Sequence, residues 1–186
     1  LPIAVNEPLP VVVMAHGFSA TIDGMVGERY AEVFCAAGFA VLLYDHYSFG
    51  RSGGQPRCQI NKWYQARGYY DAISYVASLP EIDSERIGIW GDSMSGAIAI
   101  VAASVDKRVK AVVAQVPACG REPHPEDPDG QLFQSLAKTI LRDDLLSIPT
   151  TSTPMMPVVS YDQIGTPAQL EPLTAFKWFI EYGGAF

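Results

Sequence analysis

The sequence is poor in basic residues and in long apolar runs. Its 186 residues hold 13 Lys and Arg against 20 Asp and Glu, a formal net charge of −7 without any basic stripe. This balance argues against a nucleic-acid partner. The longest apolar runs have only the length of strands, which excludes a membrane-spanning helix and hence a membrane partner. No charged n-region followed by an apolar h-region opens the sequence, so no signal peptide is visible, and secretion stays open as an alternative.

Cysteine is also scarce, and its spacing excludes two further classes of protein. Cys35, Cys58 and Cys119 are odd in number and lack the spacing of metal ligands. They indicate thiols in a reducing compartment rather than a disulfide framework, so we expect a cytoplasmic protein. The sequence contains no internal repeat, low-complexity region or phosphate-binding loop. We therefore expect neither a metal nor an organic cofactor.

The order of apolar segments predicts an α/β fold. A hydrophobic fraction of 48% over this length fits one domain with a substantial core. Continuous apolar runs, typical of strands buried on both faces, alternate with segments of helical periodicity. Strands are expected at 10–15, 39–44, 86–91 and 109–116, and helices at 26–38, 60–79, 131–147 and 166–182. Strand–helix–strand order at this spacing predicts a parallel sheet with right-handed crossovers.

The most informative segment is a strand that runs through a tight turn, Gly91-Asp92-Ser93-Met94-Ser95-Gly96, into an apolar helix. This layout predicts a nucleophile elbow with Ser93 as the catalytic residue. The residues two before and two after the nucleophile must be small, and Gly91 and Ser95 are. Ser95 is a rival nucleophile, but it has a serine and not a glycine two positions before it. Alternatively, the turn is only a strand-to-helix loop with a serine N-cap.

A second segment predicts an oxyanion hole. The apolar strand at 10–15 ends at His16-Gly17-Phe18. An oxyanion needs two backbone N–H donors, and we assign these to Phe18 and to Met94, the residue after the nucleophile. Gly17 would let the backbone approach the substrate. We interpret His16 as a structural histidine that hydrogen-bonds the backbone of its loop.

The strand at 39–44 runs into a glycine-rich turn that holds Asp45, Gly50, Arg51 and Ser52. We interpret Asp45 and Arg51 as organisers of this loop.

With these three motifs in order, the chain resembles the α/β-hydrolase superfamily. The Gly-x-Ser-x-Ser-Gly version is similar to the dienelactone-hydrolase-like and YcjY-like branch, which includes relatives of serine peptidases and X-Pro acylpeptidases.

The resemblance implies a central parallel sheet with helices on both faces and a helical cap. We expect residues 1–118 to form the hydrolase core and residues 119–186 the cap with its connecting helices. The resemblance also implies outer strands for which we find no segments here. The rest of the fold would then come from the same or a second chain, and the apolar cap helices could equally bury a homodimer surface.

None of the three histidines stands where a catalytic base is expected. In the superfamily the acid and histidine follow the nucleophile, but His16 and His46 precede it. His124 follows it, in a loop with Glu122, Glu126 and Asp127, where an exposed loop histidine is the plainer explanation. We therefore expect the catalytic acid and base to lie outside the 186 residues of this sequence.

The resemblance implies a serine hydrolase, similar to carboxylester hydrolases, that cleaves an ester, thioester or amide of a small to medium acyl compound. Two alternatives stay open from the sequence. One is a non-catalytic ligand-binding protein on the same fold, because no base is visible. The other is an acyltransferase or a C–C hydrolase that uses the same site.

Overall fold

The computed structural model describes residues 7–23, 27–119, 126–141, 157–162, 166 and 173–182. Strands and helices alternate through the first four strands, as predicted. The elements are β1 (Leu9–Ala15), α1 (Gly27–Ala36), β2 (Ala40–Tyr44), α2 (Lys62–Ala77), β3 (Ile82–Asp92), α3 (Ser93–Val105), β4 (Val109–Gln115), α4 (Gln131–Leu141) and α5 (Leu173–Tyr182). None of the helices in these ranges is long and apolar enough to cross a membrane.

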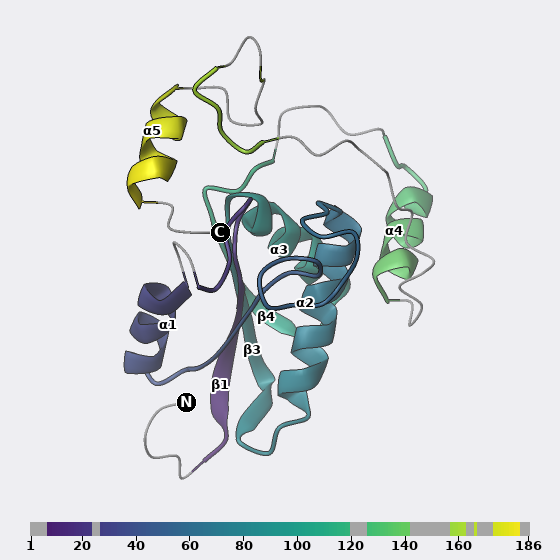
Figure 1. Ribbon diagram of the computed structural model, residues 1–186. Helices are drawn as coiled ribbons and strands as arrows, with labels where there is room; N and C mark the ends of the chain where they lie inside the picture. The colour runs from purple at the N-terminus through teal and green to yellow at the C-terminus, as the bar shows by residue number, and fades with distance from the viewer. Residues whose placement is uncertain are drawn as a thin grey trace.

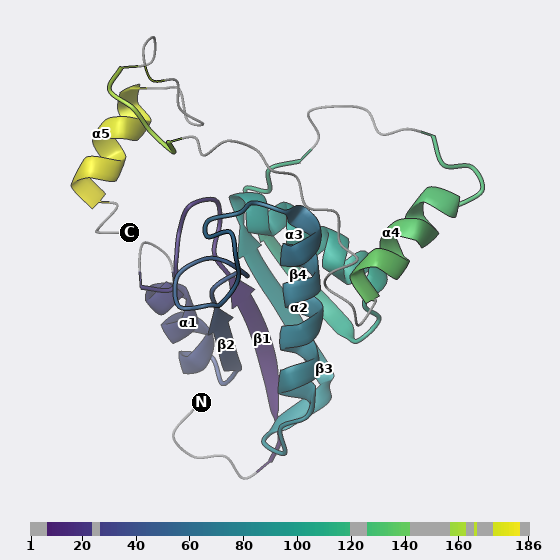
Figure 2. The same cartoon turned by 45° about the vertical axis from the view of Figure 1, so that its right-hand side comes forward.

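The four strands form one parallel sheet in the order β2-β1-β3-β4 (Figures 1 and 2). This confirms the predicted α/β fold. Strand β1 lies between β2 and β3, and its register pairs Ala15 with both Tyr44 and Gly91. Since the strands are parallel, the loops after β1, β2 and β3 leave the sheet at one edge. The segments that follow these three residues therefore lie side by side.

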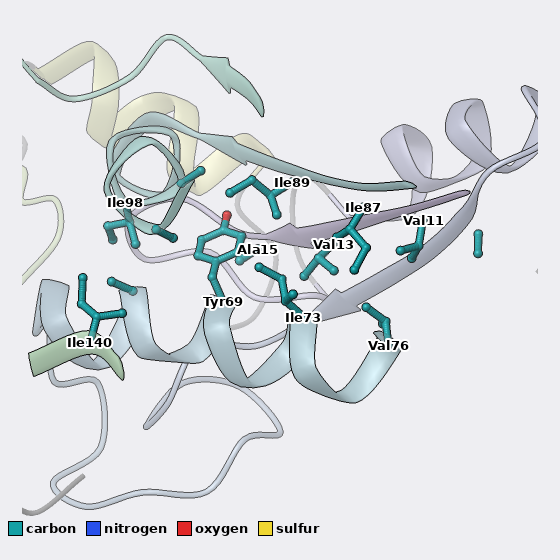
Figure 3. Close-up of a cluster of buried hydrophobic side chains, with 14 of the residues drawn as sticks. Val11, Val13, Ala15, Tyr69, Ile73, Val76, Ile87, Ile89, Ile98 and Ile140 are labelled. Carbon is teal, nitrogen blue, oxygen red and sulfur yellow. The ribbon is translucent and has the colours of Figure 1, made fainter. Parts of the chain in front are cut away.

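Helices cover both faces of the sheet, and each face has its own core. On one face, α2 and α3 pack against Val11, Val13, Ile87 and Ile89 (Figure 3). On the other face, α1 packs over Val12, Met14 and Trp90. The alternation of β1 between these clusters is the period-two pattern of a strand buried on both sides, and it explains why its sequence reads as an unbroken apolar run.

Local signals set the ends of two helices that frame the site. Helix α1 ends before Gly38, whose φ of 91° lies in the left-handed region that a C-cap glycine adopts at little cost. Helix α2 begins after Asn61, whose side chain accepts hydrogen bonds from the N–H groups of Trp63 and Tyr64. The end of α1 and the start of α2 lie within two residues of the predicted helix ranges 26–38 and 60–79.

The later part of the chain is described only in pieces. Helices α4 and α5 lie within the predicted ranges 131–147 and 166–182, and residues 142–156 and 167–172 are outside the described residues. Ile140 of α4 is buried in the core beside α2 (Figure 3). The division at residue 118 and the cap role of residues 119–186 remain predictions.

Within the described residues, β2 and β4 each have one strand neighbour. The open strand β4 leaves the side chains of Val112 and Val113 exposed, although both are apolar. An unpaired strand edge with exposed apolar side chains offers a site where a further strand can pair.

Candidate active site

Ser93 stands at the junction of β3 and α3 with a strained backbone. Its φ is 48°, in the left-handed region that non-glycine residues rarely adopt. The side chain is half-buried, and within the described part of the chain its hydroxyl has no hydrogen-bond partner. Its carbonyl accepts a hydrogen bond of 2.9 Å from the N–H of Ala118, beyond β4. The turn thus has the backbone conformation of a nucleophile elbow.

Two glycines permit this turn because strand and helix almost touch there. A Cβ on Gly91 would lie 2.4 Å from the carbonyl oxygen of Ser95 and 2.7 Å from the hydroxyl of Tyr69. A Cβ on Gly96 would lie 3.1 Å from the carbonyl oxygen of Gly91 and 3.2 Å from that of Gln115. The small residues predicted around the elbow are therefore required by contact between backbones.

The loop after β1 lies against the elbow. A Cβ on Gly17 would be 2.8 Å from Oδ2 of Asp92, so the residue before Phe18 touches the residue before Ser93. Among the described residues no acceptor bonds the N–H of Phe18 or of Met94. The N–H of Met94 also belongs to the first turn of α3, the positive end of the helix dipole. The geometry thus brings together the two segments that carry the assigned oxyanion donors.

Asp92 carries a buried carboxyl beside the nucleophile. Burial raises the pKa of Asp92 above its usual value, and the N–H groups of Asp92 and Gly17 offset part of this shift. Its Oδ1 atom is buried without a partner in the described part of the molecule. Although it occupies the N-cap position of α3, its side chain makes no capping hydrogen bond.

His16 has the structural role predicted for it. Its Nδ1 lies 3.0 Å from the carbonyl oxygen of Gly17, and its Nε2 accepts the backbone N–H of His46 at 3.2 Å. Burial lowers the pKa of His16, so the ring is neutral near pH 7. With both nitrogens engaged, His16 has no nitrogen left to act as a base for Ser93.

Asp45 is confirmed as a loop organiser. Its carboxylate accepts the N–H groups of Ile22 and Arg51, both at 2.8 Å, and so fastens the loop after β1 to the loop after β2. The Arg51 side chain pairs with Asp23 at the surface, with two hydrogen bonds of 2.8 and 2.6 Å. Both residues serve the loops, and neither reaches the elbow.

Sequence reasoning missed the role of His46, which follows β2 and is completely buried below the elbow. Its Nε2 lies 2.6 Å from the hydroxyl of Ser95. It also missed the buried Tyr69 of α2 (Figure 3). The Tyr69 hydroxyl donates to the carbonyl oxygen of Trp90 at 2.8 Å. The available signal was position: His46 comes directly after a parallel strand, at the edge where Ser93 also emerges.

Of the later loop that holds the alternative base His124, the structure describes only the part from Glu126 onward. Glu122 and His124 lie outside the described residues. Asp127 accepts the N–H groups of Leu132 at 3.0 Å and Phe133 at 2.8 Å, and thereby caps α4. Within the described ranges no group of three or more His, Cys, Asp or Glu side chains could hold a metal, and all three cysteines are free thiols.

Comparison with known proteins identifies the family. The family model of the X-Pro dipeptidyl-peptidase, S15 family, matches residues 1–170. The chain belongs to this family. Membership of the S15 family makes the protein an α/β hydrolase and confirms the superfamily inferred from the three motifs. The family is one of serine hydrolases, and proteins similar to this chain include thiohydrolases and polyketide transferases.

Three proteins illustrate the range of functions among those similar to this chain. Thiohydrolase aneE of Aspergillus aculeatus is 44% identical over 108 residues, which cover 58% of this chain and 34% of aneE. Polyketide transferase claH of Penicillium crustosum is 38% identical over 119 residues, covering 62% of this chain and 38% of claH. The solved structure of DcsB in complex with its substrate analogue shares 38% identity at a TM-score of 0.58, covering 61% of this chain and 39% of DcsB. The chain thus spans little more than a third of the length of the curated relatives it matches.

Proposed function

We propose that the protein is a serine hydrolase that cleaves a thioester or ester of a small to medium acyl group, with Ser93 as nucleophile. The observation that carries the proposal is the left-handed backbone of Ser93, with φ at 48°. Such strain costs on the order of 1–3 kcal/mol and persists where it serves a site. Gly91 and Gly96 make room for it, and a binding protein would have no need of a strained serine.

In the proposed reaction the Ser93 oxygen attacks the acyl carbonyl carbon, and the carbonyl electrons move onto oxygen. The N–H groups of Phe18 and Met94 stabilise this oxyanion. The bond to the leaving group then breaks, and the leaving thiolate or alkoxide receives the proton that Ser93 gave up. Water hydrolyses the acyl-enzyme and restores Ser93. We assign the proton transfers to a histidine outside the described residues, because His16 is fully hydrogen-bonded and His46 is held by Ser95.

Two relatives favour a thioester as the acyl donor, since a thiohydrolase and a polyketide transferase are both similar to this chain. The second of them supports one alternative, in which an acceptor other than water takes the acyl group from Ser93. Both reactions share the acyl-enzyme and differ in what attacks it. No metal or organic cofactor takes part in the proposed reaction.

The test is labelling of the full-length protein with a fluorophosphonate, followed by intact mass and peptide mapping. We expect one adduct on Ser93, hydrolysis of S-acyl-N-acetylcysteamine thioesters, and loss of both in Ser93→Ala. Ser104→Ala is the matched control, because Ser104 is exposed on the same helix and its hydroxyl donates to the carbonyl oxygen of Val101, away from the elbow. Turnover that survives in Ser93→Ala refutes the proposal. Ligand binding without any adduct favours a non-catalytic binding protein instead.

A further inference from the structure

Directly below the elbow lies a set of buried polar side chains to which the proposed reaction gives no task. The exposed fraction of the residue is 0% for Ser95, 0% for His46 and 3% for His16. The elbow needs a small residue at position 95, and glycine would satisfy that need. A buried hydroxyl is unfavourable unless it is hydrogen-bonded, so the hydroxyl of Ser95 calls for its own explanation.

The hydrogen bonds of Ser95 form a chain with one direction. Its hydroxyl donates to the carbonyl oxygen of His16 and therefore has no proton left for a second partner. At 2.6 Å from Nε2 of His46 it can then only accept, which places the proton of the neutral imidazole on Nε2. The Nδ1 atom of His46 is left as a bare acceptor, and it is buried without a partner among the described residues. The backbone N–H of His46 closes the chain by donating to Nε2 of His16.

The chain connects the backbones on which the two assigned oxyanion donors sit. His16 lies two residues before Phe18, and Ser95 directly follows Met94. His46 reaches the pair from the end of the neighbouring strand β2. The hydrogen bond from the Ser95 hydroxyl to the carbonyl oxygen of His16 thus joins the first turn of α3 to the loop after β1. This hydrogen bond therefore ties together the two segments that carry the N–H groups of Phe18 and Met94.

We propose that Ser95 and His46 are positioning residues, which hold the two halves of the oxyanion hole at the separation that the oxyanion requires. This inference rests on the proposed function of Ser93. Neither residue touches the substrate or carries a catalytic proton. Displacement of a reacting group by about 1 Å can reduce a rate by a factor of about 100, so a loosened oxyanion loop is expected to act on kcat.

The imidazole of His46 keeps its role over the whole working pH range. Burial lowers the pKa of His46 to about 3, with the nearby His16 ring adding to the shift. The ring centroids of His16 and Tyr44 lie 4.9 and 5.5 Å away and enclose it. A neutral, enclosed ring with a fixed proton serves as a structural donor and not as an acid or base. Changes at His46 should therefore leave the pH profile of turnover in place.

The experiment compares kcat, KM and the pH profile of full-length wild type, Ser95→Ala, His46→Leu and His46→Gln with a thioester substrate. Rates are expressed per site that a fluorophosphonate titrates, so that unfolded protein does not count. For Ser95→Ala and His46→Leu we expect kcat to fall about 10- to 100-fold with little change in KM. Glutamine can place an N–H donor where Nε2 of histidine stood, so His46→Gln should recover part of the loss. Ser104→Ala, on the exposed side of the same helix, should match wild type.

Three results would overturn the inference. If kcat per titrated site is the same in Ser95→Ala as in wild type, the Ser95 hydroxyl serves folding alone. A pH profile displaced in His46→Gln shows that His46 exchanges protons in the reaction. A wild-type protein that neither labels at Ser93 nor turns over the thioester refutes the proposed function and this inference together, whereas active wild type with unaffected variants refutes the inference only.

Discussion

Replacement of Gly91 by alanine tests the close contact on which the elbow depends. The added Cβ would lie 2.4 Å from the carbonyl oxygen of Ser95, 2.5 Å from its carbonyl carbon and 2.7 Å from the hydroxyl of Tyr69. Two of these atoms belong to the backbone of α3, so no rotation of a side chain can relieve the overlap. The end of β3 and the start of α3 must move apart.

The size of the effect follows from two opposing contributions. Overpacking of a filled interior costs about 1–3 kcal/mol and occasionally more. Alanine restricts the unfolded chain more than glycine does, which offsets about 0.4–1 kcal/mol. Because the overlap is with backbone atoms, we take the overpacking cost at its upper end, about 3 kcal/mol. For Gly91→Ala we therefore expect a net loss of about 2 kcal/mol in the free energy of unfolding. With a urea m-value of about 2 kcal/mol/M, the midpoint should fall by about 1 M.

Two other glycines provide a graded control in urea unfolding. A Cβ on Gly88, in the same strand, would meet its nearest atom, the carbonyl oxygen of Ala111, at an ordinary 3.6 Å. Gly88→Ala should be neutral or slightly stabilising. Gly96→Ala should lie between the two, because its contacts of 3.1 and 3.2 Å are offset by the higher helix propensity of alanine, about 1 kcal/mol. Gly91→Ala should also slow labelling of Ser93 by a fluorophosphonate. Equal stability of Gly91→Ala and Gly88→Ala would refute the reasoning.

Two further predictions concern His46 and Asp45, the two buried polar residues directly after β2. In the unfolded chain His46 takes up a proton below its ordinary pKa of 6.5, whereas in the folded chain it does so only near a pKa of about 3. The contribution of His46 to the free energy of unfolding is therefore complete above pH 6.5 and is lost as pH falls towards 3. Between pH 8 and 5 the free energy of unfolding should fall by about 2 kcal/mol for this reason. In urea unfolding, the free energy of His46→Gln should depend less on pH than that of wild type. An equal pH dependence of the two proteins would contradict the prediction. Asp45→Ala should lower the free energy of unfolding by about 2–4 kcal/mol, because it leaves the N–H groups of Ile22 and Arg51 without an acceptor. Arg51→Ala, which removes only the exposed pair with Asp23, should change it by less than about 1 kcal/mol, and an effect equal to that of Asp45→Ala would count against this account.

Most of the fold could be predicted from local sequence. The unbroken apolar run of β1 reports burial on both faces, and Gly38 and Asn61 mark helix ends with their own backbone and side chain. The strand–turn–helix segment around Ser93 is local too, because the small residues that it needs stand within a few positions of one another. Such features follow from neighbours along the chain, so the sequence alone is sufficient to find them.

The polar support of the elbow could not be predicted in this way. Ser95 bonds His46 and the backbone of His16, which are 49 and 79 residues away along the chain. A serine read locally is only a small residue in a turn, and a histidine after a strand is only one more loop residue. Their pairing depends on the order in which the parallel strands are placed, and many sequences of similar pattern would pair differently.

The sequence by itself therefore determined the α/β class, the approximate positions of the strands and the strand–turn–helix segment around Ser93, since each depends on periodicity or on residues close in the chain. Only the tertiary structure decided that β1 lies between β2 and β3, and hence that the loop of Phe18 touches the elbow and that His46 lies beneath it. The physical reason is that burial and hydrogen bonding between distant segments are settled by packing, which no local pattern encodes.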